Sequence, residues 1–344
     1  MRLTPFLEES ANEISIHNDG VIEAMGWTPL VIDPANVADA FVNGSGGVLR
    51  ATDRGILQVT ASGGGALQNH GVIEVLDGST ISIEASGLAN YAAGVLTGGT
   101  YRVLSAGAPS TLDLGSATIR ANAATIHLGG TNSAFAALDE LADNIGSLTL
   151  SGGRELLTKG ELSNTGEIHV LSGGRLSVLG SLTSSATSLI TGAGEIRGSS
   201  LQLAGTVAPG DGAGMLSLIG NTELFASTRL LFHLGSSAEN YARLSIDGSS
   251  TLDGSLDVIG EPGFGAGEYR IVSYTGSFTN NGLELGDLPA GYSYHLKTDV
   301  PGQVILSVSV PEPSSALLAI AGLLQLLDCG SRNERLRRRS RQRP

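Results

Sequence analysis

The stretch N-T-G-E-I-H-V-L-S-G-G-R-L-S-V, residues 164–178, decides the fold. Apolar and polar side chains alternate on either side of a glycine pair, with Ile168 and Val170 before it and Leu176 and Val178 after it. A period of two with one apolar face is typical of a half-buried β-strand. Glycine suits the corners because it accepts positive φ angles without a steric penalty. The stretch therefore predicts two short strands joined by a tight turn.

The same phrase occurs twice more in the chain. N-D-G-V-I-E at 18–23 and N-H-G-V-I-E at 69–74 match N-T-G-E-I-H at 164–169. The spacings are 51 residues (69 − 18) and 95 residues (164 − 69), which approximate two and four solenoid coils of about 24 residues each. Stacked coils of strands, about 4.8 Å apart, form a parallel β-helix in which each coil buries its apolar face on its neighbours. We therefore expect an all-β, right-handed parallel β-helix over residues 1–243, with the asparagines at equivalent corners bonding locally or stacking as a ladder.

Two segments depart from the coil pattern. S-A-F-A-A-L-D-E-L-A-D-N at 133–144 has Phe135, Leu138 and Leu141 at helical spacing, which predicts a short helix lying over a coil edge. Residues 244–309 contain two D-G turns and strand-like segments at 269–274 and 304–310. We expect this β-rich C-terminal region to cap the solenoid, since an uncapped end exposes strand edges to other chains.

The repeat phrases resemble those of a known class of bacterial surface protein. Residues 146–178, and the G-T-V-A-P-G-D-G-A-G-M-L phrase at 205–216, are similar to phrases in autotransporter-associated and planar surface-repeat proteins. The resemblance covers roughly the second half of the chain before residue 310. It implies a β-helix body displayed at a cell surface.

The end of the chain resembles the PEP-CTERM sorting signal of bacteria with an outer membrane. It has three parts in order: a motif at 310–315, an apolar segment at 316–327 and a basic segment at 328–344. The motif consists of Val310, Pro311, Glu312, Pro313, Ser314 and Ser315; the membrane and topology residues are Ala316, Leu317, Leu318, Leu323, Leu324, Leu326, Leu327, Arg335, Arg337, Arg338 and Arg339. The resemblance implies recognition of 311–313 by an exosortase-like membrane enzyme.

The same tail predicts a short C-terminal membrane helix. Its uninterrupted apolar run, 316–327, is shorter than the roughly twenty residues that span a hydrocarbon core, so the flanking small residues of 314–331 must join the span. The arginines then stay on the cytoplasmic side by the positive-inside rule. The alternative is a C-terminal helix packed on the domain, with a solvated basic end.

Charge and cysteine content limit the partners. The chain carries a formal charge of −13, made of about −17 before Pro311 (13 basic minus 30 acidic residues) and +4 after it (7 minus 3). An acidic body repels phosphate backbones, so we expect no nucleic-acid partner. Cys329 is the only cysteine, so no disulfide within the chain is expected. Residues 1–13 contain no apolar signal-peptide segment, so we expect either that the chain starts inside a longer gene product or that the start codon is misassigned; both imply further N-terminal coils.

The chain shows no strong catalytic or metal-binding motif. The six histidines are scattered, and the glycine-rich segments lack the lysine of a phosphate-binding loop. Paired carboxylates suited to glycoside cleavage or calcium binding are Asp247 with Asp253 or Asp257, and Asp139 with Glu140 and Asp143. The first group is better explained as two turns. Of the tyrosines, Tyr269, Tyr274, Tyr292 and Tyr294 group loosely, and we expect them in the core or at a sheet edge.

These observations lead to one preferred hypothesis. The chain is an exported, non-enzymatic repeat protein of the cell surface or extracellular matrix, an adhesin or structural rod, anchored first in the inner membrane and then processed near 311–313. Its expected partners are the exosortase-like enzyme, the inner membrane and an extracellular polysaccharide. Two alternatives stay open: a polysaccharide-active β-helix enzyme and a non-catalytic glycan-binding module. We predict no catalytic residue, no metal ligand and no cofactor.

Overall fold

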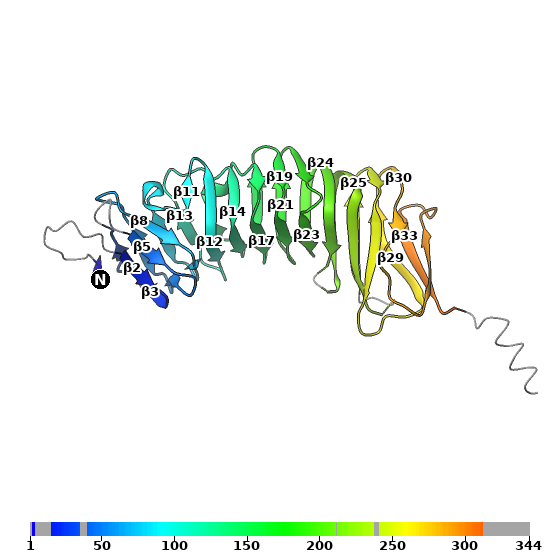
Figure 1. Ribbon diagram of the computed structural model, residues 1–344, viewed down its shortest axis with the longest axis horizontal. Coiled ribbons are helices and arrows are strands. Elements are labelled where there is room, and N and C mark those ends of the chain that lie inside the picture. Colours follow the sequence, from blue (N-terminus) through cyan, green and yellow to red (C-terminus); the bar gives the residue numbers. More distant parts are fainter. Residues whose placement is uncertain (1, 4–14, 35–39, 211, 237–240, 312–344) are drawn as a thin grey trace, which may run out of the picture.

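Short strands of alternating apolar and polar residues wind into a rod-shaped parallel β-solenoid (Figure 1). The structure, a computed structural model, describes residues 2–3, 15–34, 40–210, 212–236 and 241–311. The described part contains about eleven turns, with very little helix. The predicted fold class, an all-β parallel solenoid, is confirmed.

Each turn passes through three faces, here called faces 1, 2 and 3 in chain order. Face 1 contains β3 (Val21–Met25), β6 (Val48–Thr52), β9 (Val72–Val75), β12 (Val95–Leu104), β14 (Ala121–Gly129), β17 (Ser147–Ser151), β20 (Glu167–Val170), β23 (Leu189–Gly192), β28 (Ser255–Gly260) and β31 (Glu284–Leu285). Two long strands, β24 (Glu195–Pro209) and β25 (Gly214–Leu234), run through all three faces without a break.

Face 2 contains β1 (Arg2–Leu3), β4 (Leu30–Ile32), β7 (Ile56–Val59), β10 (Thr80–Ile83), β13 (Ser110–Asp113), β15 (Ser133–Ala134), β18 (Glu155–Thr158), β21 (Arg175–Val178), β26 (Ala242–Asp247) and β29 (Gly267–Tyr274). Face 3 contains β2 (Ser15–Asn18), β5 (Ala40–Asn43), β8 (Ala66–Asn69), β16 (Asp143–Asn144), β19 (Leu162–Asn164), β22 (Ser181–Ser184), β27 (Ser250–Leu252) and β30 (Phe278–Asn280). A short hairpin strand, β11 (Tyr91–Ala92), pairs antiparallel with the start of β12.

Parallel pairing keeps equivalent residues in register from turn to turn. Asn18, Asn43 and Asn69 are direct partners on neighbouring strands, at sequence intervals of 25 (43 − 18) and 26 (69 − 43). Asn144 and Asn164 are direct partners at a shorter interval of 20 (164 − 144). The turns lengthen again near the C-terminal end, where Ser217 pairs with Ser245 (245 − 217 = 28). The predicted coil length is therefore an average over shorter middle turns and longer turns towards both ends.

The inward-facing residues of face 1 form a continuous column along the rod. Each contacts the equivalent residue one turn away, and all are fully buried: Leu49, Ile73, Tyr101, Ile126, Leu148, Ile168, Ile190, Val207, Leu230 and Leu256. Burial of one such aliphatic side chain contributes about 1.5–3 kcal/mol. Stacking of like on like therefore provides the core that a single turn could not provide for itself.

Glycine at the corner before face 1 allows neighbouring turns to approach closely. A Cβ atom on Gly71 would lie 2.1 Å from the carbonyl oxygen of Gly47, and one on Gly166 would lie 2.1 Å from that of Gly146. Neither glycine has a positive φ angle. In these two copies the glycine of the N-x-G phrase is thus required for space, rather than for the conformational freedom that the sequence suggested, whereas a Cβ on Gly20, in the first copy, meets no described atom within 4 Å.

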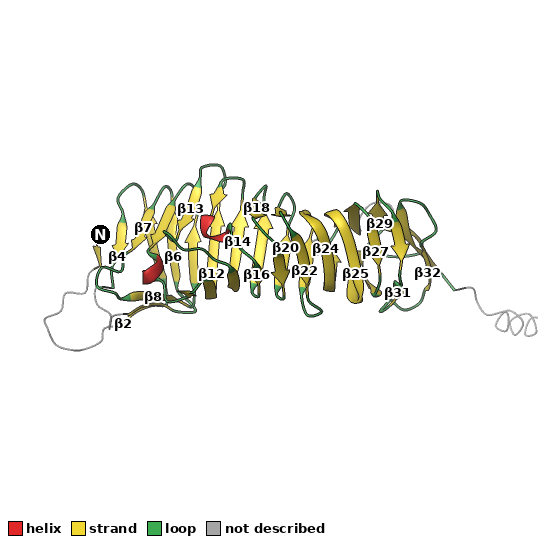
Figure 2. Cartoon of the chain, turned by 90° about the horizontal axis from the view of Figure 1, so that it is seen from above, coloured by secondary structure: helices red, strands yellow, loops and turns green. Residues whose placement is uncertain are grey.

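The helix predicted at 133–144 is largely wrong. Only Ala136–Leu138 forms a helical turn, the 3-10 helix η2; a second such turn, η1, covers Ala85–Gly87 (Figure 2). The flanking residues belong to β15 and β16, which pair with neighbouring turns. Phe135, Leu138 and Leu141 are at most 1% exposed and belong to the core. Their spacing directs all three side chains into the core from one tight bend of the chain. The helix stops after one turn because the residues on both sides of it pair with strands of neighbouring turns.

Parallel pairing continues beyond residue 244, through β26, β27 and β28 to β29, β30 and β31. Two antiparallel strands follow, β32 (Ser293–Lys297) and β33 (Gln303–Ser309), with β33 paired to both β29 and β32. The predicted strands of this region are present. Its division from the solenoid at residue 244, and its role as a cap, stay predictions.

Aromatic side chains gather in this last region. Tyr269 is fully buried, and its hydroxyl donates to the carbonyl oxygen of Gly235 at 3.0 Å. Its ring packs on Tyr241 and Phe264, with ring centroids 5.4 and 5.6 Å apart. Tyr274, Tyr292 and Tyr294 pack against the core while partly exposed. The expected core or edge position of these four tyrosines is confirmed.

Candidate interaction surface

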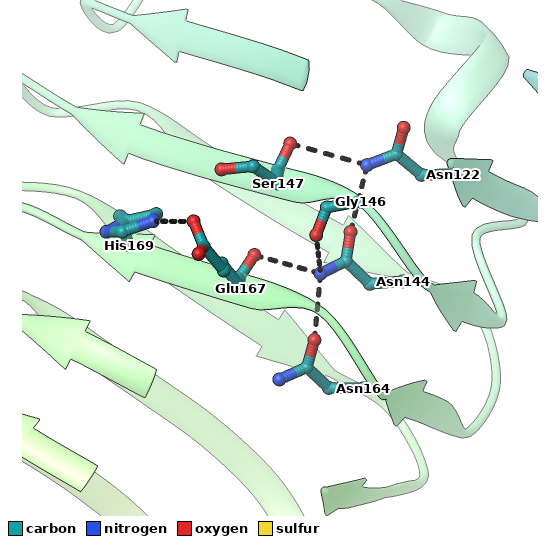
Figure 3. Close-up of polar contacts among 7 residues, drawn as sticks. All are labelled: Asn122, Asn144, Gly146, Ser147, Asn164, Glu167 and His169. Carbon is teal, nitrogen blue, oxygen red and sulfur yellow. Dashed lines mark hydrogen bonds and ion pairs between the residues drawn. The ribbon is translucent and has the colours of Figure 1, made fainter. Parts of the chain in front are cut away.

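An asparagine ladder holds the corner between faces 3 and 1. Asn122 Nδ2 donates to Asn144 Oδ1 at 2.9 Å, and Asn144 Nδ2 donates to Asn164 Oδ1 at 2.8 Å (Figure 3). All three side chains are fully buried. Asn144 also reaches the next turn by donating to the carbonyl oxygen of Glu167 at 2.9 Å. The alternative in which the corner asparagines stack as a ladder is thus observed.

A second, N-terminal ladder has the same polarity. Asn18 Nδ2 donates to Asn43 Oδ1, and Asn43 Nδ2 donates to Asn69 Oδ1, each at 2.8 Å. The two ladders are separated at the turn of β12, where Leu96 stands in register with Asn122. There the chain makes an extra hairpin, and Asn90 exchanges hydrogen bonds with the backbone of Asn69 instead. These ladders fix the corner and leave its buried amides unavailable to a ligand.

Outward from face 1, an alternating charge column runs along the N-terminal turns. It consists of Glu23, Arg50, Glu74 and Arg102, one residue per turn in direct register. Arg50 Nε lies 2.8 Å from Glu74 Oε2, and Arg102 Nη1 lies 2.8 Å from Glu74 Oε1. The Glu74 side chain is only 6% exposed, between two arginines that are 33% and 40% exposed. Opposite charges on adjacent turns favour this register over a slipped one.

His127 extends the column by one turn. Its Nε2 lies 2.9 Å from the hydroxyl of Ser151. Burial, with a smaller contribution from the charge of Arg102, lowers the pKa of His127 below its usual value. The imidazole is therefore neutral at pH 7, so the column ends on an uncharged polar group.

A shorter charge column lies on face 2 beside a groove. Arg175 lies between Glu155 and Glu195, with Nη1 3.7 Å from Glu155 and Nε 2.7 Å from Glu195. The Nε contact is an ion pair without hydrogen-bond alignment. Arg197 pairs with Glu195 along the same strand. Its hydrogen bond is the main cause that lowers the pKa of Glu195. Glu195 therefore stays ionised near neutral pH and is unsuited to act as a general acid.

The groove itself crosses three turns at the corner between faces 1 and 2. It has a volume of about 630 Å³, within the range of small-ligand sites. It is lined by small residues together with charged, polar and apolar side chains: Ser172, Gly173, Gly174, Arg175, Ala193, Gly194, Glu195, Ala213, Gly214, Met215 and Ser217. The exposed backbone and single ion pair can bind a polar chain. Ser217 lies in register with Glu195 across the groove, but among the described residues no hydrogen bond joins their side chains.

The structure does not gather the predicted carboxylates into a site. Asp257 is buried and paired with Arg229, and it accepts from the backbone N–H of Asp287 at 2.9 Å. Asp253 accepts from Gly254 N at 2.7 Å and from Asn281 Nδ2 at 3.0 Å, as expected of a turn residue. Asp247 accepts from the Thr275 hydroxyl at 2.7 Å. Each carboxylate therefore has a local structural partner on its own turn or the next.

The second predicted group is also engaged on the surface. Lys159 Nζ lies 3.8 Å from Asp139 Oδ2 and 3.1 Å from Glu140 Oε1, while Asp143 lies on β16. Across residues 2–311, apart from the gaps in the description, no three acidic, histidine or cysteine side chains are placed to hold a metal ion. Two of the three carboxylates in this group are therefore held by one lysine at the surface.

Most of the predicted sorting residues lie outside the described residues. Only Val310 and Pro311 are described: both are exposed and follow the end of β33. Glu312, Pro313, Ser314, Ser315, the apolar segment 316–327 and the basic segment 328–344 lie beyond them. Within the part that the structure describes, no helix has the length and apolar character to cross a membrane.

The charge columns were not predicted from the sequence. Their members lie on different turns and are distant in the chain, as are Arg50 and Glu74 (74 − 50 = 24). The available signal was the repeat of the N-x-G-V-I-E phrase, which places Glu23 and Glu74 at one position two turns apart. Arg50 lies on the turn between them and provides the opposite charge next to both carboxylates.

Comparison with known proteins connects this body to an adhesin. A segment of the chain is 42% identical over 109 residues to the adhesin BmaC autotransporter of Brucella suis biovar 1 (strain 1330). The matched segment covers 30% of this chain and 3% of the length of that adhesin. No protein-family model matches the chain. The similarity agrees with the autotransporter-type repeat expected from the sequence and with the observed β-solenoid.

Proposed function

We propose that this protein is an exported, non-enzymatic adhesin-like rod, displayed at the cell surface or held in the extracellular matrix. The single observation that supports this most is the 42% identity to an autotransporter adhesin, found in a chain that folds as a β-solenoid. The outward-facing carboxylates Glu74 and Glu195 support a structural role rather than a catalytic one, because arginines of their own or adjacent turns already pair with them. Its mechanism is geometric presentation of side chains rather than chemical turnover.

The rod suits repeated weak contacts with a polymer. Equivalent outward residues recur on every turn, at the strand spacing of about 4.8 Å. A polysaccharide that lies along the axis can therefore meet several turns at once, and linked weak contacts add to a high avidity. The groove at 172–217 is the place where such a chain contacts both exposed backbone and Arg175.

Binding can be tested with the purified full chain on a glycan array, followed by titration with and without calcium. Arg175→Ala should weaken retention of a bound glycan several-fold, while Arg120→Ala, which removes an exposed arginine outside the groove, should not. Equal retention by both variants would remove the groove from the proposal. An absence of glycan binding together with loss of cell adherence on gene deletion would move the contact to another class of receptor.

The enzyme alternative makes an opposite prediction. If the chain cleaves polysaccharide, a screen of soluble glycans should yield shortened products, and Asp247→Asn or Asp253→Asn should abolish them. The hydrogen bonds of both carboxylates to neighbouring residues favour structural roles. We therefore expect no product from the parent protein.

We further propose that the tail sorts the protein through an exosortase-like enzyme after transient insertion in the inner membrane. Supporting this, β33 ends at Ser309 and Val310 is 66% exposed, so the start of the motif is accessible to a membrane-bound partner. Mass spectrometry of the surface or secreted form should find a C-terminus near 311–313. Retention of residues 316–344 in that form would refute cleavage while leaving the adhesin proposal intact.

A further inference from the structure

A sequence phrase at the N-terminal end of the solenoid occurs again in the interior of the rod, where neighbouring turns pair with it on both sides. N-D-G-V-I-E at 18–23 repeats N-H-G-V-I-E at 69–74. At 69–74, strands β5 and β6 cover the N-terminal side, in register with β8 and β9. At 18–23, the described strands lie only on the C-terminal side, where β5 and β6 pair with β2 and β3. The contacts that residues 69–74 make on their N-terminal side therefore show which side chains can pair with residues 18–23 on the same side.

Two polar contacts join residues 69–74 to the turn on their N-terminal side. Asn69 Oδ1 accepts a hydrogen bond from Asn43 Nδ2 at 2.8 Å, and Glu74 Oε2 lies 2.8 Å from Arg50 Nε. By contrast, among the described residues Asn18 Oδ1 accepts only from Gly20 N, at 3.3 Å. In the same described part, Glu23 has only Arg50, at 3.7 Å on its C-terminal side. Its side chain is 34% exposed, against 6% for Glu74.

The apolar residues of this end are also less covered than their equivalents. Ile16 is 37% exposed, whereas Phe41 and Leu67, at the same position one and two turns on, are 2% and 0% exposed. Val21 and Met25 on β3 are 58% and 60% exposed. An edge strand with exposed apolar side chains is a template for pairing with another strand.

The position of β1 shows from which direction that strand comes. Arg2 pairs with Val31 from the side opposite to Gln58, so β1 takes the face 2 place of a turn that precedes β3. In the two turns that follow, the face 1 residue of the charge column stands eight residues before this face 2 position (31 − 23 and 58 − 50). A strand that leads directly into β1 therefore lies beside β3.

We propose that the N-terminal end of the rod, residues 15–25, is a docking face for a parallel β-strand that leads into β1. The strand itself brings a lysine or arginine into register with Glu23, and the segment just before it brings an amide donor to Asn18 Oδ1. The required pattern is an asparagine followed, at the next face 1 strand, by a cationic residue, as Asn43 and Arg50 supply to the copy at 69–74. The inference rests on strand pairing and charge, and it holds whether or not the protein is an adhesin.

The test adds a copy of residues 43–56 directly before Met1 of the full chain. This places the copied Arg50 eight residues before Arg2, which is the spacing observed in the two following turns. Thermal unfolding should shift to a higher Tm, and the backbone amides of β3 should exchange more slowly with deuterium. The same extension carrying Arg50→Glu in the copy should lose the gain, because two carboxylates then face each other.

A charge swap makes the test specific. The Arg50→Glu extension on a Glu23→Arg background should recover part of the lost Tm, although Glu23→Arg alone weakens the contact with the native Arg50. Equal Tm and equal β3 exchange for the arginine and glutamate extensions would overturn the proposal. Protection of β3 by the free peptide of residues 40–56, and not by the covalent extension, would assign the face to a separate chain and would also overturn it.

Discussion

At the scale of the residue, the asparagine ladder leads to a prediction about Asn144. Its side chain accepts from Asn122 and donates to Asn164 and to the backbone of Glu167, all in a fully buried position. Asn144→Ala leaves buried polar atoms on both neighbouring turns without these partners. Since each such atom costs about 1–3 kcal/mol, we expect a loss of about 2–4 kcal/mol in the free energy of unfolding, measured by urea denaturation.

Asn164→Ala is the matched control for this change. Asn164 ends the ladder, and its own Nδ2 has no hydrogen-bond partner among the described residues. Its removal leaves only Asn144 Nδ2 without one acceptor, and Asn144 still donates to Glu167. The control should cost clearly less than Asn144→Ala. Equal losses would mean that the stacked amides contribute nothing beyond filling space.

The corner glycines lead to a second residue-scale prediction. Gly166→Ala forces a Cβ to within 2.1 Å of the Gly146 carbonyl oxygen, so the two turns must separate locally. We expect a loss of about 1–3 kcal/mol in unfolding free energy, the usual cost of overpacking. Gly160→Ala is the control, because a Cβ there meets no described atom within 4 Å. A comparable loss in both variants would contradict the close-approach explanation.

His127 predicts a pH dependence. Its pKa is lowered in the folded state, chiefly by burial, from a model-peptide value of 6.5. Well above pH 6.5 the imidazole is neutral whether folded or unfolded, and it makes no difference to stability. Below that pH the unfolded chain binds the proton more readily, so the folded state loses stability as pH falls. His127→Gln should show a smaller drop in Tm between pH 7 and pH 5 than the parent protein.

At the scale of the element, the charge column predicts how adjacent strands are held in register. Glu74→Gln leaves Arg50 and Arg102 facing each other across β9 without a carboxylate between them. Because both arginines are partly exposed, we expect a loss of about 1–3 kcal/mol rather than the larger cost of a fully buried pair. Glu268→Gln, which breaks the exposed pair with Lys297, should change unfolding by less than about 1 kcal/mol. Similar effects at both sites would show that burial of Glu74 is unimportant.

The strands that the sequence predicted best are those in which two independent signals agree. At 164–178, alternation and corner glycines both indicate strands, and β20 and β21 are found there. At 133–144, local helical spacing competed with the requirement that both ends join neighbouring turns, and strand pairing prevailed. Local propensity is weak against such tertiary contacts.

The surface features needed information that a single turn does not carry. Arg175 meets Glu195 only because the turn that joins them is shorter than the first turns of the rod, which separate Asn18, Asn43 and Asn69. A sequence period averaged over the chain cannot assign these partners. The groove has the same origin, since its small residues, such as Gly174 and Gly194, align only after the turn length is known.

At the scale of the whole molecule, the rod should behave as a nearly one-dimensional array. Each turn contacts its immediate neighbours, so stability is approximately a sum of turn and interface contributions. Asn144→Ala should therefore accelerate hydrogen–deuterium exchange most in β16 and in its paired neighbours β14 and β19, and leave β26, β28 and β29 close to the parent. In the parent, β2 and β3 should exchange faster than β17 and β20, because described strands pair with them on one side only. Uniform acceleration along the chain would instead show one cooperative unit, in which loss of a single ladder amide is transmitted to the far end of the rod.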